Sequence, residues 1–348
     1  MKHSFPFVFL CTLLFAARTA ADAGQVAIRL GTILPSGTAQ HAALQEMGEQ
    51  WRKATGGAVK LTLYPDGRLG GEAEMVRKLR IKQINATLLS AVGLAEIDPG
   101  VAGLQMMPLA FESWAAVDHV REKLRTRLED RLRTKGYEVL FWADAGWVRF
   151  FTTEPVVRPE DLKRMKIFVW AGDQAQMELM QSLGYRPVPL ETTDILLGLN
   201  TGMINAVPMP ALIALAGQMN TAAPHMLDLK WSPIVGAAVV RSEVWEQIPA
   251  VHREAIRTAA RTAGEKVRAR GRAEDEEAVR VMQRRGLQVH PVPPEARAEW
   301  DRLVARVYPQ LRGTKVPAEI FDEVMASLAT FHPVDQPPAL AMLPVSPP

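Results

Sequence analysis

The sequence predicts an α/β protein with two lobes, and three observations support this fold class. Short β-like runs alternate with amphipathic helical patterns from Gln25 onward, which is typical of parallel strands covered by helices. The chain of 348 residues is longer than a single hydrophobic core usually organises. Residues 250–286 form an almost uninterrupted helical pattern that would extend beyond one lobe. We therefore expect two lobes and one unusually long helix.

The expected strands are short runs rich in β-branched, aromatic and leucine side chains, bounded by glycine, proline or polar residues. In chain order they cover residues 26–32, 59–64, 85–89, 138–143, 148–152, 166–170, 186–189 and 234–241.

The expected helices carry apolar residues at helical spacing, as in the stripe of Leu44, Met47 and Trp51. Before the long helix they cover residues 42–54, 72–82, 115–134, 174–183 and 212–220. The pattern at 250–286 leaves two interpretations open. One is a strut that lies across both lobes. The other is a solvated charged helix that frays at Gly264 and Gly271, because each glycine costs about 1 kcal/mol relative to alanine in a helix.

The N-terminus has the features of a secretory signal peptide in the expected order. A charged start leads into an apolar segment at 5–17 and then into the small-residue triplet at 21–23. We therefore expect residues 1–23 to be removed by cleavage near Ala23 and the protein to be exported to the periplasm. Because the only cysteine, Cys11, lies in this segment, the mature chain has no thiol for a disulfide or a thiolate metal site.

The composition and the motifs argue against several functional classes. A net charge of +3 is too close to neutral to indicate nucleic acid as a partner. The histidines lack metal-binding spacing, and no nucleophile elbow, Walker loop or dinucleotide fingerprint occurs, so we expect no enzyme, metal or cofactor. The acidic pairs Glu72/Glu74 and Glu274/Asp275 lie in helical charge runs, where we expect solvated faces.

Five stretches, in this order, carry a resemblance to a known family: LYPDGRLGGEAEMVRKLR (63–80), MPLAF (107–111), RPEDLKRMKIFV (158–169), LGYRPVPLETTDILLGLNTGMINAVPMP (183–210) and PIVGAAVVRSEVWEQIP (233–249). Together they resemble the periplasmic solute-binding proteins of tripartite ATP-independent periplasmic (TRAP) transporters, of the C4-dicarboxylate-binding type. The similarity spans residues 26 to about 325. It implies a type II-like periplasmic-binding-protein fold with crossing strands and a long bracing helix, which favours the strut for 250–286.

The resemblance also implies domain boundaries and partners. We expect lobe I to comprise residues 24–147 with 234–265, and lobe II to comprise 148–233 with 266–335. The proline-rich residues 336–348 would form a disordered tail. The lobes would close over a small organic ligand, which the protein would deliver to the small and large membrane subunits of a TRAP permease.

Two positions depart from the family pattern. The family strand usually reads K-I-R-V, and its arginine binds a ligand carboxylate through a bidentate salt bridge, but this chain has Phe168 at that position. The family segment V-D-G-x-E-N-P corresponds here to residues 204–210, which include Asn205 and Met209. One interpretation is a cleft rebuilt for an apolar or aromatic ligand, with Phe168, Trp170 and Met209 as contact surface. The other is that Phe168 turns into the core of lobe II.

Further ligand-binding candidates come from loops at strand ends and from the expected crossover segments. Arg149 is the best surviving cation and would anchor an ordinary carboxylate if the cleft is not rebuilt. The remaining candidates are hydroxyl and indole side chains, namely Ser36, Thr38, Ser90, Trp147 and Trp231. A periplasmic enzyme would need a nucleophile or an acid–base set, and none is evident. A ligand sensor acting on a signalling partner would use the same fold, so sensing remains an alternative to uptake.

Overall fold

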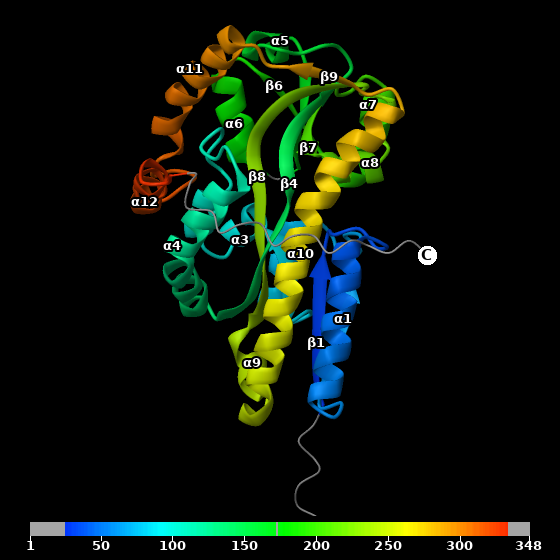
Figure 1. Ribbon diagram of the computed structural model, residues 1–348, viewed down its shortest axis with the longest axis vertical. Helices are drawn as coiled ribbons and strands as arrows, with labels where there is room; N and C mark the ends of the chain where they lie inside the picture. Colours follow the sequence, from blue (N-terminus) through cyan, green and yellow to red (C-terminus); the bar gives the residue numbers. More distant parts are fainter. Residues whose placement is uncertain (1–24, 172, 333–348) are drawn as a thin grey trace, which may run out of the picture.

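The computed structural model describes residues 25–171 and 173–332 (Figure 1). The expected signal peptide, its cleavage site and the expected disordered tail lie outside these residues. Within them, the chain forms the predicted two-lobed α/β fold with crossing strands and a long helix. No helix in the described part of the chain combines the length and the apolar character needed to cross a bilayer.

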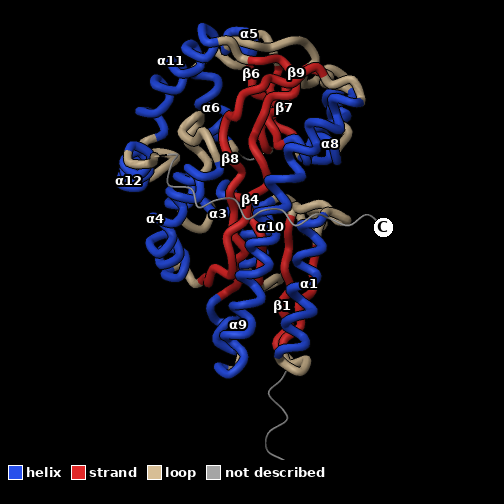
Figure 2. The backbone as a smooth tube through the Cα atoms, viewed as in Figure 1, coloured by secondary structure: helices blue, strands red, loops and turns tan. Residues whose placement is uncertain are grey.

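Two long antiparallel strands, β4 (Tyr137–Thr152) and β8 (His225–Arg241), run through both lobes (Figure 2). The sequence predicted two separate strands, 138–143 and 148–152, where the structure has the single strand β4. It also placed the start of β8 at residue 234, nine residues too late. Both strands keep their pairing through the centre because bulges absorb irregular residues there.

All strands belong to one mixed sheet with the order β2-β1-β3-β8-β4-β7-β5-β6, and β9 pairs with β8 at its other edge. The lobe I strands are β1 (Val26–Thr32), β2 (Val59–Tyr64) and β3 (Ala86–Ser90). The lobe II strands are β5 (Lys166–Trp170), β6 (Arg186–Leu190), β7 (Ala206–Pro210) and β9 (Gln288–Pro291). Lobe I strands therefore extend from β8, and most lobe II strands extend from β4.

Helices cover both faces of the sheet in each lobe. In lobe I these are α1 (Ala39–Ala54), α2 (Glu72–Arg80), α3 (Ala91–Ala95), η1 (Pro99–Leu104), α4 (Trp114–Thr134) and α9 (Ser242–Gln247). In lobe II they are α5 (Pro159–Lys163), α6 (Gln174–Ser182), η2 (Thr192–Asp194), α7 (Ile195–Asn200), α8 (Ala211–Ala216), η3 (Met219–Thr221) and α11 (Pro294–Leu311). Four apolar clusters result, two in each lobe, one on either face of the sheet.

The long helix α10 (Ala250–Arg284) is a strut (Figure 1). Its first half packs with α1 in lobe I through Ile256 and Ala260, and its last turns pack in lobe II through Ala278 and Met282. The helix does not fray at its glycines. Gly264 and Gly271 are buried, and an added Cβ at Gly271 would collide with the carbonyl oxygen of Asp144 on β4.

The C-terminal part of the chain returns to lobe I. The expected boundaries assigned all of 266–335 to lobe II, but α12 (Ala318–Ala329) packs against α4 and η1 of lobe I through Ile320 and Val324. This packing is favourable because α12 buries its apolar stripe in the cluster formed by α4 and η1 of lobe I.

Candidate ligand-binding site

The parallel strands of both lobes end at the centre of the crossing strands. In lobe I, Ser90 at the end of β3 pairs with Gly236 of β8. In lobe II, Pro210 at the end of β7 pairs with Val148 of β4. Open α/β sheets bind ligands beyond the carboxyl ends of their strands. We call this central zone the strand-end region, and it is the candidate site.

The strand β5 presents one aromatic side chain to solvent and buries the other. Phe168 is only 1% exposed and Met209 only 2%, and both pack with Phe151 in the lobe II cluster beneath α7 and α8. Trp170, at the carboxyl end of β5, is 37% exposed, and its ring meets that of Phe168 edge to face at 5.0 Å. The structure thus favours the core interpretation for Phe168 and Met209, and it leaves Trp170 as the accessible ring.

Arg149 is buried and already paired. Its Nη1 atom lies 2.8 Å from Oδ2 of Asp275, and its Nη2 atom lies 2.8 Å from Oε1 of Glu276, both on α10. Asp275 also accepts hydrogen bonds from the backbone N–H groups of Trp147 and Leu212. Burial alone would lower the pKa of Arg149, but the two carboxylates raise it overall. This guanidinium therefore joins α10 to lobe II before any ligand arrives.

The hydroxyl candidates of lobe I differ in their exposure and in their internal hydrogen bonds. Ser36 is exposed, and its backbone N–H donates to Asp66 over 2.7 Å. Hydrogen bonds from the backbone and the side chain of Ser36 lower the pKa of Asp66. Thr38 caps α1, where its Oγ1 also donates to a backbone carbonyl. The Oγ atom of Ser90 donates to Glu72 over 2.6 Å. Burial raises the pKa of Glu72, although the hydrogen bonds from Ser90 act in the opposite direction.

Asn205 lies at the wrong end of its strand for a cleft residue. Its Oδ1 atom accepts the backbone N–H of Lys166 over 2.6 Å, at the start of β5, whereas Trp170 marks the other end. Asn85 does the same before β3, where its Oδ1 accepts the N–H of Arg29 over 2.6 Å. The two segments share the sequence Ile-Asn-Ala. In both lobes, therefore, an asparagine side chain before one strand accepts a backbone N–H of the neighbouring strand.

The indoles of Trp147 and Trp231 belong to the junction between the lobes. Trp147 is 1% exposed and packs against Trp114 of α4, with 4.7 Å between the ring centroids. Trp231 is half-buried between Phe150 and Trp300, with centroid distances of 5.5 and 5.7 Å. Trp231 is therefore the more accessible of the two.

Asp275, the most important acidic residue of this region, was not predicted from the sequence. Glu274/Asp275 were expected on a solvated face, but Asp275 is 1% exposed, and Glu274 accepts the N–H of Ala39 at the start of α1 over 3.2 Å. Burial raises the pKa of Asp275, although Arg149 acts against this. No local signal in the run Glu-Asp-Glu-Glu distinguishes the buried residue from its neighbours, because its burial depends on the strand behind α10.

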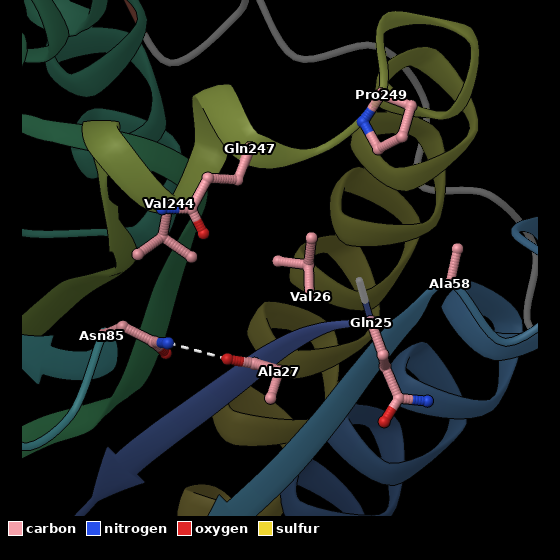
Figure 3. A pocket seen from close by; sticks show the side chains of 8 residues that line it. All are labelled: Gln25, Val26, Ala27, Ala58, Asn85, Val244, Gln247 and Pro249. Atoms are coloured by element: carbon pink, nitrogen blue, oxygen red, sulfur yellow. Dashed lines mark hydrogen bonds between the residues drawn. The ribbon is translucent and has the colours of Figure 1, made fainter. Parts of the chain in front are cut away.

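Two shallow pockets lie away from the strand-end region. One, of about 350 Å³, lies at the amino ends of β1 and β2, opposite to the candidate site (Figure 3). Its lining residues are Gln25, Val26, Ala27, Ala58, Asn85, Val244, Gln247 and Pro249. The other, of about 650 Å³, lies between the end of α8 and the end of α10. Neither pocket contains a predicted ligand-binding residue.

Two α/β lobes, joined by antiparallel crossing strands and with their parallel strands ending at the junction, define the class of two-lobed solute-binding proteins. The chain belongs to the DctP family, described as bacterial extracellular solute-binding protein, family 7, whose model matches residues 30–314. Proteins of this family are the periplasmic solute-binding components of TRAP transporters and not enzymes.

Several known proteins are similar over almost the whole chain. The C4-dicarboxylate-binding periplasmic protein DctP of Rhodobacter capsulatus is 23% identical over 322 residues, covering 91% of this chain and 95% of the relative. The sugar acid binding protein of Advenella mimigardefordensis, solved with galactonate, has a TM-score of 0.80 at 19% identity, covering 88% of this chain and 98% of that one. A TRAP solute-binding protein from Desulfovibrio salexigens, solved with orotic acid, has a TM-score of 0.79 at 17% identity, covering 88% and 99%.

Proposed function

We propose that this protein captures a small organic acid between its lobes and delivers it to a TRAP-type membrane permease. In this proposal, the ligand has a more apolar or aromatic body than a C4 dicarboxylate. Export would precede function, so N-terminal sequencing of the periplasmic product should begin at or near Gly24. A cytosolic product that retains Met1 would contradict the transport function.

One observation carries the proposal about the ligand: Arg149 and Ser90, two of the predicted polar candidates of the strand-end region, already bind internal partners. Arg149 is bound to two carboxylates, Ser90 is bound to Glu72, and the family's arginine position holds the buried Phe168. The accessible ring of Trp170 remains. This combination offers apolar contact surface and few free groups for a second carboxylate.

The expected binding free energies also favour an apolar or aromatic ligand over a C4 dicarboxylate. Loss of a buried charge-assisted pair removes roughly 2–5 kcal/mol, so succinate or malate should bind on the order of a hundredfold or more below an arginine-bearing relative. At about 25 cal/mol per Å², an aromatic ring or short acyl chain that buries roughly 150 Å² gains about 4 kcal/mol before ordering costs.

Calorimetry of the protein, stripped of any co-purified ligand, tests this proposal. The titrants are succinate, malate and galactonate, together with aromatic and acyl acids and their neutral amides. We expect heat from members of the aromatic or acyl set and little from succinate. Micromolar succinate binding without a response to the apolar compounds would contradict the proposed ligand class.

A second candidate is an ordinary carboxylate binder anchored by Arg149. It is favoured by one observation: the outer partner of Arg149, Glu276, is 45% exposed and could be displaced by a ligand carboxylate. In that case Arg149→Lys should abolish succinate binding, because a lysine cannot reproduce the bidentate contact.

A further inference from the structure

The strand β8 has a wide bulge at the junction of the lobes. Val148 of β4 faces Ser232 of β8, and Phe150 faces Leu227, so residues 228–231 of β8 stand opposite Arg149 alone. Bulges re-aim side chains and occur next to functional sites. Arg149 in turn pairs with Met209, one residue before the carboxyl end of β7. The bulge therefore lies at the level of the strand-end region.

The bulge carries Lys230, which has no ion-pair partner among the described residues. Lys230 is exposed, and none of the described carboxylates lies within ion-pair distance of it. Its Nζ atom lies 5.5 Å from the ring centroid of Trp147. The other lysine or arginine residues of the two crossing strands, Arg149 and Arg241, are each paired with glutamate or aspartate. Lys230 is thus the free cation of β4 and β8.

A buried donor beside Lys230 also lacks a partner. The Nε1 atom of Trp147 is inaccessible to water and has no hydrogen-bond acceptor among the described residues. Leaving a buried N–H unsatisfied costs about 1–3 kcal/mol. Because no solvent reaches this N–H in the present arrangement, attraction of an anion to this part of the junction depends on the charge of Lys230 itself.

We propose that Lys230 recognises the carboxylate of the ligand, the role that Phe168 cannot perform. This inference rests on the proposed function and deepens it: the ligand class is a monocarboxylic acid with an apolar or aromatic body. One free lysine suits one carboxylate, and a lysine acts as a point charge that does not require bidentate geometry. The half-buried ring of Trp231, next to Lys230 in β8, then provides surface for the apolar body.

The test compares acids with their neutral amides in the wild type and in lysine variants. The probes are phenylacetate, indole-3-acetate and hexanoate, each paired with the corresponding amide. Lys230→Met removes the charge, and Lys230→Arg retains it. Lys60→Met is the matched control, because Lys60 is also an exposed strand lysine without an ion pair among the described residues.

We expect at least one acid to bind the wild type more tightly than its amide. Lys230→Met should weaken binding of that acid roughly tenfold to a hundredfold, as expected for a hydrogen bond to a charged group, and should leave amide binding unchanged. Lys230→Arg should retain most of the acid affinity, and Lys60→Met should behave as the wild type.

Four results would overturn the role of Lys230. Equal acid binding by Lys230→Met and the wild type would do so, as would equal affinity of the wild type for an acid and its amide. Binding of the amides without any of the acids would overturn it while leaving the capture of an apolar ligand in place. Binding of neither set would contradict the inference and also the proposed ligand class.

Discussion

At the residue scale, Asp275 is the group on which the junction between α10 and lobe II depends. It accepts the Arg149 guanidinium and two backbone N–H groups while it is 1% exposed. Removing one partner of such a buried pair leaves an uncompensated charge and two unsatisfied donors. We expect Asp275→Ala to lower the free energy of unfolding by about 3–5 kcal/mol, measured by urea denaturation.

Glu276 provides the control for this prediction, since it contacts the same arginine from a half-exposed position. Glu276→Gln should cost less than about 1 kcal/mol, because exposed ion pairs contribute little. If the two variants unfold at the same urea concentration, the buried contacts of Asp275 do not stabilise the junction as described.

The sequence located some accessible residues of the candidate region but not all of them. Trp170 and Ser36 were predicted near strand ends, and their place in the chain follows from strand order. Phe168 could not be assigned to cleft or core, because both faces of 166–170 are apolar. Lys230 was missed because a bulge in β8 leaves no mark in the alternation of residues.

At the element scale, close packing of α10 on β4 depends on glycine. An alanine Cβ at Gly271 would meet the Asp144 carbonyl and the Gln40 amide, neither of which can move without breaking its own contacts. We expect Gly271→Ala to destabilise the protein by about 1–3 kcal/mol in urea denaturation. On a solvated helix the same change would instead stabilise by about 1 kcal/mol.

The control is Ala269→Gly, two residues earlier on the exposed face of α10. It measures the difference in helix propensity between alanine and glycine where no neighbouring group restricts the side chain. It should cost about 1 kcal/mol without any steric change. A stabilised Gly271→Ala would show that α10 does not rest on β4 in solution.

The parallel βαβ part of the fold was predictable, whereas the crossing strands were predicted only in fragments. The runs at 26–32, 59–64 and 166–170 agree closely with β1, β2 and β5 because each is a short apolar run between turns. Gly146 and Pro233 are typical strand breakers. Gly146 lies between the two runs predicted for β4, and Pro233 comes directly before the single run predicted for β8. Each of these two long strands is continuous because it pairs with the other along its length, and the local sequence does not indicate this pairing.

At the scale of the whole molecule, the chain passes repeatedly between the lobes. Strands β4 and β8, helix α10 and the connection from α11 to α12 all cross the junction. The expected boundary at residue 265 therefore cuts through α10, and α12 returns to lobe I. Sequence periodicity identifies apolar faces but does not state which lobe covers them, so this return could not be predicted.

The central claim is that the two lobes close over a ligand held at their junction. Solution X-ray scattering tests it most directly, with the stripped protein and with the acid that binds most tightly in calorimetry at saturation. We predict a smaller radius of gyration with ligand and an unchanged helix content by circular dichroism, because rigid lobes move about the crossing strands. An unchanged radius at saturation would contradict the account of this protein as a closing clamp.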